Sequence, residues 1–341
     1  MSHSILINRD VMVSYRQSKI IHVSTDVKSK KVTSIDFDDS GTSLVTCDHE
    51  ALNLYDIKNG KFQKTLFSKK YGAHFARFTH QSSNCIHAST RESDIIRYLS
   101  VHTNQYIRYF KGHKEKVTSL EVSPADDHFL SASLDGTVRI WDLSSSNCQG
   151  MLTIPSPSWL AFDPAGVVFA VACEQTAEIL LYDLRNYDSE PFAVFKIEPL
   201  RGNGAVSWSK IEFSNDGKHI LVATNGPSHY LLDAFSGEII MKFSGHTVNK
   251  PTQPRVYESS GDCTLTPDSR FVVSGSTDKK VYIYDIQSPV RDNIQKPLVA
   301  IDSKKPISSL LFNPRLSMFA TADHEVTFWL PNKDESKPRD S

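Results

Sequence analysis

A short alternating segment recurs seven times along this 341-residue chain. Each copy carries two apolar residues two positions apart, and the pairs are Ile35/Phe37, Ala76/Phe78, Leu120/Val122, Leu160/Phe162, Ile211/Phe213, Cys263/Leu265 and Leu310/Phe312. Alternation with a period of two predicts β-strands with both apolar side chains on one face. The second members of successive pairs are 41, 44, 40, 51, 52 and 47 residues apart. This spacing is typical of a four-stranded repeating unit.

A second landmark recurs in the same seven units, because each closes with Trp-Asp or a pair related to it. These pairs are Tyr55-Asp56, Leu99-Ser100, Trp141-Asp142, Tyr182-Asp183, Leu232-Asp233, Tyr284-Asp285 and Trp329-Leu330. Turn-forming residues separate the two landmarks in every unit except the second, as in Asn215-Asp216-Gly217. One four-stranded sheet cannot bury both of its faces, whereas radial packing of several sheets can. We therefore predict an all-β, seven-bladed WD-repeat β-propeller.

The last unit has residues for only three strands, and this shortage predicts how the ring closes. The segment from Val11 to Val23 is expected to supply the missing outer strand. The predicted organisation is an N-terminal segment closing the last blade at 1–25, the propeller at 26–330 and a disordered polar tail at 331–341. Residues 199–207, 247–262 and 287–306 are expected to form surface connections.

Composition excludes several classes of protein. The net charge of −1 gives no general attraction to nucleic acid or to an anionic membrane. The longest apolar stretch, Val167–Cys173, is far shorter than the ~20 residues of a membrane span, and no signal peptide is visible, so a soluble intracellular protein is expected. Five widely spaced cysteines favour reduced buried thiols over zinc ligands or disulfides. No cofactor is expected.

The third unit contains a set of polar residues that resembles a hydrolase triad. The set is Gly112-His113, Ser133, Asp135 and Trp141. No strained nucleophile turn such as Gly-x-Ser-x-Gly accompanies it, so we interpret it as a buried structural network running from Asp to His, to a hydroxyl, to the indole N–H. The sixth unit has a partial copy, expected to be weaker, with Tyr284 in place of Trp; its members are His246, Ser276 and Asp278.

Other signatures of catalysis are absent from the sequence. It has no Gly-x-x-x-x-Gly-Lys phosphate loop and no His-Glu-x-x-His, and Gly202-Asn203-Gly204 lacks the third glycine of a dinucleotide site. We therefore predict a rigid interaction platform and not an enzyme. Two alternatives are a propeller hydrolase and a scaffold of an unrelated assembly, such as the substrate receptor of a ubiquitin ligase or a vesicle coat.

Several stretches outside the generic repeat resemble one narrower family over essentially the whole propeller. They are Ser68-Lys69-Lys70-Tyr71-Gly72, Ile96-Arg97-Tyr98-Leu99-Ser100, Tyr106-Ile107-Arg108-Tyr109-Phe110, Asn147-Cys148-Gln149-Gly150, Phe213-Ser214-Asn215-Asp216-Gly217-Lys218, Asp233-Ala234-Phe235 and Phe328-Trp329-Leu330-Pro331. They are similar to the WD-repeat subunit of the COMPASS histone lysine methyltransferase. The same family occurs in the cleavage and polyadenylation factor, within its phosphatase module, and in a complex with protein phosphatase type 1.

The resemblance implies a nuclear, non-catalytic adaptor that couples chromatin modification or transcription termination to RNA polymerase II. The implied partners are the methyltransferase catalytic subunit, subunits of the polyadenylation factor and its phosphatase module, and the phosphorylated C-terminal repeats of the polymerase. Which complex this chain joins stays open at this point. Candidate partner-binding residues are Lys69, Lys70, Tyr71, Arg97 and Arg108, because Arg and Lys clusters recognise phosphate. The competing interpretation is solvated loop residues.

Overall fold

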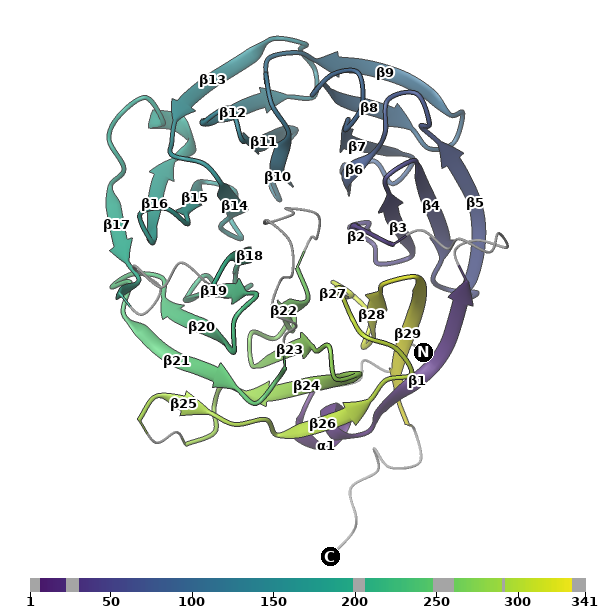
Figure 1. Ribbon diagram of the computed structural model, residues 1–341, viewed down its shortest axis with the longest axis vertical. Helices are drawn as coiled ribbons and strands as arrows, with labels where there is room; N and C mark the ends of the chain where they lie inside the picture. The colour runs from purple at the N-terminus through teal and green to yellow at the C-terminus, as the bar shows by residue number, and fades with distance from the viewer. Residues whose placement is uncertain (1–6, 23–30, 199–205, 248–260, 290–291, 333–341) are drawn as a thin grey trace, which may run out of the picture.

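Seven β-sheets are arranged radially around one axis, as the blades in Figure 1 show. The computed structural model describes residues 7–22, 31–198, 206–247, 261–289 and 292–332. Six sheets have four strands and one has five. The four main strands of each blade run antiparallel to their neighbours, and the fifth strand of one sheet is added in parallel. The predicted all-β, seven-bladed propeller is therefore confirmed.

Each blade is built from an innermost strand outward. The innermost strands are β2 (Ser34–Phe37), β6 (His74–Phe78), β10 (Val117–Val122), β14 (Ser158–Phe162), β18 (Trp208–Phe213), β22 (Cys263–Leu265) and β27 (Ser309–Phe312). The second strands are β3 (Ser43–Asp48), β7 (Asn84–Ala88), β11 (His128–Ser133), β15 (Val168–Cys173), β19 (His219–Thr224), β23 (Phe271–Gly275) and β28 (Phe319–Ala322). All seven predicted apolar pairs thus lie on innermost strands.

The outer half of each blade follows the same order. The third strands are β4 (Ala51–Asp56), β8 (Ile96–Ser100), β12 (Thr137–Asp142), β16 (Glu178–Asp183), β20 (Ser228–Asp233), β24 (Lys280–Asp285) and β29 (Glu325–Pro331). The outer strands are β5 (Lys61–Phe67), β9 (Gln105–Phe110), β13 (Cys148–Thr153), β17 (Ala193–Lys196), β21 (Ile239–Ser244), β26 (Val299–Asp302) and β1 (Tyr15–His22). A short 3₁₀ helix, Leu184–Asn186, follows β16.

The hydrophobic core lies between the blades. Seven clusters of buried apolar side chains are found among the described residues, and each is shared by two adjacent blades. Between blades 2 and 3, for example, Phe110 packs edge-on against Phe129, which stacks on Trp141. Because every blade needs both neighbours to cover its two faces, the ring is stable only when it closes.

The N-terminal strand closes the ring as predicted. Strand β1 pairs antiparallel with β29, from Tyr15 opposite Pro331 to His22 opposite Glu325. One part of the prediction was wrong, because Val11 and Val13 lie in a short helix, α1 (Arg9–Val13), and not in the strand. The side chain of Asn8 caps this helix by accepting a hydrogen bond from the Val11 amide, a bond that an extended chain would not make.

Two predicted boundaries are corrected by the strands. The stretch 287–306 was expected to be a surface connection, yet it contains β26 and the short β25 (Ile294–Gln295), which pairs in parallel with β21. Pro331, assigned to the polar tail, is the last residue of β29. The remaining tail from 333 and most of the predicted loops at 199–207 and 247–262 lie outside the described residues.

Candidate protein-interaction surface

The polar network of blade 3 joins the β9–β10 connection, which carries His113, to the β11–β12 connection, which carries Asp135. Nδ1 of His113 lies 3.1 Å from Oδ2 of Asp135, and its Nε2 lies 2.7 Å from the hydroxyl of Ser131. The indole N–H of Trp141 donates to the same hydroxyl at 2.8 Å. Since a carboxylate only accepts, the imidazole donates through Nδ1 and accepts at Nε2. These hydrogen bonds link buried side chains of neighbouring strands and connections, and the hydroxyl of Ser131 is buried and not exposed as a nucleophile would be.

The hydroxyl in this network was assigned to the wrong serine. Ser133 donates to the backbone carbonyl of Glu115 at 2.8 Å and accepts from the amide of Asp135 at 3.1 Å, and it does not contact the imidazole. Ser131 and Ser133 point to the same face of β11, so alternation alone does not distinguish them. The pairing of Phe129 with Trp141 brings Ser131, two residues further along β11, to the indole.

Burial and hydrogen bonding set the protonation of this pair. Desolvation is the largest influence on the pKa of both His113 and Asp135. It lowers the pKa of His113, and the negative charge of Asp135 raises that pKa by less than desolvation lowers it. For Asp135 desolvation is outweighed by hydrogen bonds from Thr137 and from the Lys114 amide and by the nearby imidazole. These lower the pKa of Asp135 from 3.8 to about 2. A neutral imidazole beside a carboxylate is therefore the resting state.

The partial copy in blade 6 is connected differently from the prediction. Nε2 of His246 faces the carbonyl of Gly226, and its Nδ1 lies 3.5 Å from the hydroxyl of Tyr284. Asp278 accepts from Tyr282 at 2.6 Å, and among the described residues no hydrogen bond links it to His246. Ser276 bonds the backbone of Thr247. The predicted Asp–His link is thus absent from the described part of blade 6.

Four of the five predicted partner-binding residues gather at one place between blades 1 and 2. The guanidinium carbon of Arg97, on β8, lies 3.6 Å from the ring centre of Tyr71. Lys69 and Lys70 flank it in the β5–β6 connection, Lys69 over the ring of Phe67 at 5.0 Å and Lys70 over that of Tyr71 at 5.2 Å. We call these four residues, together with Tyr106 and Tyr109 of β9, the Arg97 surface.

Arg97 is the buried centre of this surface. Its side chain is only 4% exposed, and two further rings, of Tyr106 and Tyr109, lie 5.4 and 5.1 Å from its guanidinium. Its Nε donates to the hydroxyl of Ser89 at 2.8 Å. No ion pair in the described part of the chain links Arg97 to a carboxylate. The buried guanidinium is therefore held by cation–π contacts with aromatic rings and by one hydroxyl.

The loop that carries the two lysines is held by backbone bonds. The carbonyl of Ser68 accepts from the amides of Tyr71 and Gly72, and the carbonyl of Tyr71 accepts from Thr90 and Arg91. Gly72 has φ of +70°, and a Cβ there would stand 2.0 Å from the hydroxyl oxygen of Thr90. Arg91 adds a bond to the carbonyl of Lys69 and an ion pair with Glu50. The position of the lysines is therefore fixed by the fold.

Arg108, the fifth predicted residue, does not belong to this surface. In the ladder of blade 2 it pairs with Tyr98, whereas Arg97 pairs with Tyr109. Neighbouring positions on a strand face opposite sides, so Arg108 points toward blade 3. There its guanidinium donates to the backbone carbonyl of Leu143. The grouping of Arg108 with Arg97 is corrected accordingly.

The chain is similar to known WD-repeat proteins over nearly its whole length. A model of the WD domain, G-beta repeat, matches residues 104–142 and 237–285. The chain is 39% identical to WD repeat-containing protein 82 of Drosophila melanogaster over 326 residues, which cover 95% of this chain and 97% of that protein. The chain belongs to the WD repeat-containing protein 82/Swd2 family.

Two fungal members of the WD repeat-containing protein 82/Swd2 family are nearly as similar. Set1 complex component swd2 of Schizosaccharomyces pombe is 39% identical, with 88% of this chain and 92% of that protein covered. COMPASS component SWD2 of Saccharomyces cerevisiae is 37% identical, with 88% and 90% covered. The predicted resemblance is thus confirmed. The two segments matched by the repeat model include both Gly-His units described above.

Sequence reasoning missed the aromatic side chains that complete the surface in this family member. Tyr106 and Tyr109 sit on β9, their rings 5.6 Å apart, and Tyr106 also lies 6.2 Å from Tyr71. His87 pairs with Arg97 across the sheet; burial and the Arg97 charge lower the pKa of His87 to about 4, so the imidazole adds no positive charge. The alternation of β9 was visible in the sequence, but its register against β8 was not.

No group of three or more His, Cys, Asp or Glu side chains in the described part of the chain is arranged to hold a metal ion. Among the helices of the described segments, none combines the length and apolarity needed to span a bilayer. The five cysteines are free thiols, four of them buried.

Proposed function

We propose that this chain is a non-catalytic adaptor subunit of nuclear complexes, namely a COMPASS-type histone methyltransferase, the cleavage and polyadenylation factor with its phosphatase module, or both. The observation that carries the proposal is the similarity over nearly the full length to proteins named as COMPASS and Set1 complex components. A closed propeller with rigid connecting loops supports it physically, because such loops present fixed side chains on two broad faces.

The adaptor would dock its partners through exposed, preformed surfaces. The Arg97 surface has the required features: cationic side chains, exposed aromatic area and a backbone already held in place. Tyr109 is 42% exposed and the neighbouring Phe67 is 64% exposed. Aromatic and arginine side chains provide most of the binding energy in typical protein interfaces. The surface is thus suited to an extended peptide that carries negative charge.

The phosphorylated C-terminal repeats of RNA polymerase II are the peptide that we assign to this surface. Three cations lie close together there, and the carboxylate of Glu92 lies 3.9 Å from Nζ of Lys70, with both side chains more than half exposed. Exposed ion pairs of this kind contribute little and are easily exchanged. A phosphate group would form a charge-assisted hydrogen bond with the exposed Lys70 in place of Glu92, and the buried charge of Arg97 would add to the attraction. Recruitment of the complex to transcribing polymerase would follow.

Partner identity is tested by purifying the tagged full-length chain from nuclei and identifying its stoichiometric partners by mass spectrometry. Recovery of a histone methyltransferase supports the COMPASS role, and recovery of polyadenylation factors with a phosphatase supports the termination role. Recovery of ubiquitin-ligase subunits instead would overturn the proposal and favour the substrate-receptor alternative. Imaging of the tagged chain tests the nuclear location independently.

Peptide binding is tested by fluorescence anisotropy with a phosphorylated and an unphosphorylated polymerase repeat peptide. The double variant Lys69→Ala/Lys70→Ala is expected to weaken the phosphorylated peptide by about tenfold, which corresponds to about 1.4 kcal/mol. The matched control is Lys58→Ala/Lys61→Ala, which removes two exposed lysines from the opposite end of the blade 1 hairpin. Equal affinity of the wild type and the Lys69/Lys70 variant would remove this surface from the proposal.

A further inference from the structure

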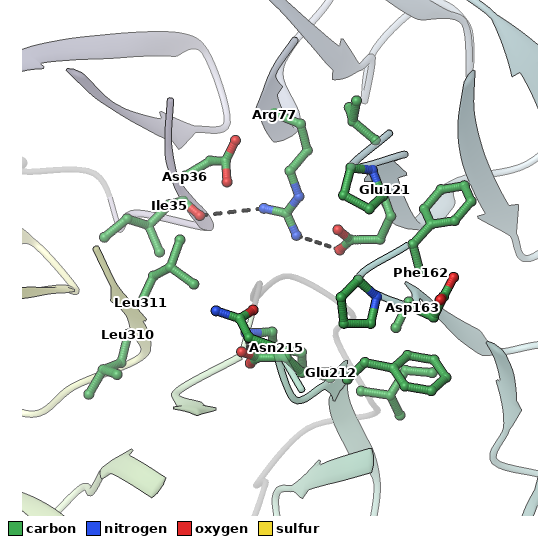
Figure 2. A pocket seen from close by; sticks show the side chains of 17 residues that line it. Ile35, Asp36, Arg77, Glu121, Phe162, Asp163, Glu212, Asn215, Leu310 and Leu311 are labelled. Atoms are coloured by element: carbon green, nitrogen blue, oxygen red, sulfur yellow. Dashed lines mark hydrogen bonds and ion pairs between the residues drawn. The ribbon is translucent and has the colours of Figure 1, made fainter. Parts of the chain in front are cut away.

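The central channel of the propeller contains two adjacent cavities of about 260 and 510 Å³. Their walls come from all seven innermost strands. In each strand the channel-facing residue is the one between the two apolar members of the repeated pair. Four of these positions carry charge, namely Asp36, Arg77, Glu121 and Glu212, and Figure 2 shows them converging on the smaller cavity. At Ala161 the corresponding side chain is small, which leaves the channel open on that side.

Each cation that lines the channel among the described residues, Arg77, Lys210 and Arg315, donates to a carboxylate or carbonyl of the protein. Arg77 donates from Nε to the carbonyl of Leu120 at 3.1 Å and from its two terminal nitrogens to the carbonyl of Ile35 and to Glu121, at 3.4 and 2.7 Å (Figure 2). Lys210 donates to Glu212 at 2.6 Å. An incoming anion would therefore have to displace a protein carboxylate or carbonyl from each of them.

The carboxylates, in contrast, keep acceptor capacity. Oδ2 of Asp36 accepts from the amide of Phe78 at 2.7 Å and Oε1 of Glu121 accepts from Arg77, but among the described residues no hydrogen bond is made to Oδ1 of Asp36 or Oε2 of Glu121. A carboxylate accepts several hydrogen bonds. The side chains of Asp36 and Glu121 lie on either side of Arg77 and line the smaller cavity. A ligand that donates hydrogen bonds matches them.

The larger cavity extends to the face of the ring where the turns between first and second strands gather. Asp39, Pro124 and Asn215 line it and are exposed. Among the described residues, six carboxylates and three cations line the two cavities. The entrance is therefore electronegative even after internal pairing, and a positively charged ligand is attracted into it.

We propose that this channel mouth binds an arginine or lysine side chain presented by a loop or terminus of a partner protein. The planar guanidinium suits the site best, because its several N–H groups reach Asp36 and Glu121 together while its stem lies along Phe162 and Phe213. The site goes beyond the proposed adaptor role and is independent of which complex the chain joins. It also lies apart from the Arg97 surface, which is set to receive an anion.

The environment of Asp36 gives the site a pH dependence. The pKa of Asp36 is raised from 3.8 to about 7, mainly by burial and further by the charges of Glu121 and Asp39. The charge of Arg77 and the hydrogen bond from the Phe78 amide lower this pKa, but they do not outweigh burial. Glu212 and Lys210 face the same cavity from β18. A cation favours the charged carboxylate, so its binding releases the proton. Affinity is therefore expected to increase as pH rises through about 7.

The test uses the full-length chain and a displayed library of short peptides with one fixed arginine in an otherwise varied sequence. Peptides that bind are synthesised with arginine and with citrulline, which keeps the shape and removes the charge. We expect citrulline to weaken binding by at least about tenfold, and Glu121→Gln and Asp36→Asn each to weaken the arginine peptide by a similar factor. The matched control, Glu190→Gln, removes one exposed carboxylate outside the cavities and should leave binding unchanged.

Two variants are used because one of them could lose its fold, and circular dichroism identifies any that does. Failure to enrich any peptide overturns the proposal. Equal binding of the arginine and citrulline peptides, or equal binding to the wild type and to both folded channel variants, overturns it as well. Stronger binding of the arginine peptide at about pH 8 than at about pH 6, abolished by Asp36→Asn, supports it.

Discussion

Ser131 and Trp141 are joined by a hydrogen bond of 2.8 Å from the indole N–H to the serine hydroxyl, and that hydroxyl also contacts His113. One side chain thus connects the second strand of blade 3, its third strand and the connection that enters the blade. All of these groups are buried. A buried polar group is stabilising only while its partners remain, so the whole network depends on a single oxygen.

Replacement of Ser131 by Ala should destabilise the fold by about 1–3 kcal/mol, because the indole N–H and the imidazole both lose their partner. The decisive measurement is a pair of double-mutant cycles with Trp141→Phe, followed by urea unfolding. Ser131→Ala should couple to Trp141→Phe by at least about 0.5 kcal/mol, whereas the matched variant Ser133→Ala should show almost no coupling. Coupling through Ser133 would restore the original assignment.

Asp135 and Asp278 occupy equivalent repeat positions but should differ in their effect on stability. Asp135 accepts bonds from His113, from Thr137 and from the Lys114 amide, so Asp135→Ala should cost about 3 kcal/mol. Asp278 has Tyr282 as its closest bonded partner, and Asp278→Ala should cost about 1 kcal/mol. Chemical denaturation of both variants provides the comparison. A larger loss in the Asp278 variant would show that blade 6 relies on a link that these contacts do not contain.

The hydrogen-bonded pair of Asp135 and His113 predicts how the stability of the fold responds to acid. The folded-state pKa of Asp135 is lowered from 3.8 to about 2, so its stabilisation is complete above the unfolded value and is lost as pH falls toward 2. The pKa of His113 is also lowered, so the fold loses stability as pH falls below the ordinary range of histidine. Stability measured by urea unfolding should therefore decrease on acidification, and between about pH 4 and about pH 2 it should decrease less steeply in Asp135→Asn, which lacks the titrating carboxylate. Parallel curves for the two proteins would contradict this.

Much of the fold was readable from the sequence because its signals repeat. The apolar pairs, the Trp-Asp relatives and the missing final strand each occur at positions where the periodic pattern itself fixes the expectation. The errors arose where two residues of one strand face share a chemistry, as Ser131 and Ser133 do, or where no repeat exists for comparison, as in helix α1 and strand β25. Local pattern gives the face of a strand but not its partner across the sheet.

The Arg97 surface illustrates the same limit. The cations were visible as a charged loop and a strand arginine, yet Tyr106 and Tyr109 became part of the surface only through the register of β9 against β8. That register includes a shift between Tyr98 and Leu99, which no short-range rule predicts. Arg108 was misplaced because its face depends on the same register. The channel carboxylates were individually visible, but only the closed ring brings Asp36 and Glu121 to opposite sides of Arg77.

Gly72 should be required for the shape of the lysine loop. Gly72→Ala places a methyl group against Thr90 at a left-handed backbone position, and we expect a loss of about 2 kcal/mol together with weaker binding of the phosphorylated repeat peptide. Gly60→Ala is the matched control, because Gly60 has φ of +57° but a Cβ there would approach only the Lys19 side chain, at 3.4 Å. Thermal unfolding separates the two variants. Equal losses would mean that backbone strain, and not the contact with Thr90, determines the effect.

The N-terminal strand should contribute strongly to stability although it lies at one end of the chain. Tyr15 is fully buried against Phe312 and Phe319, and its hydroxyl bonds Ser317 at 2.9 Å. Tyr15→Ala should therefore cost about 3–5 kcal/mol, as removal of a buried aromatic ring does. The matched variant Lys19→Ala alters an exposed position of the same strand and should change stability by less than about 0.5 kcal/mol.

Deletion of residues 1–22 removes β1 and α1 together, including the contact of Arg9 with the buried carboxylate of Asp285. The exposed edge of β29 and the uncovered faces of blades 6 and 7 should then lower the unfolding temperature by more than Tyr15→Ala does. Differential scanning fluorimetry of the deletion, the two point variants and the wild type measures this order. A deletion variant that unfolds at the wild-type temperature would show that the ring is closed without its N-terminal strand.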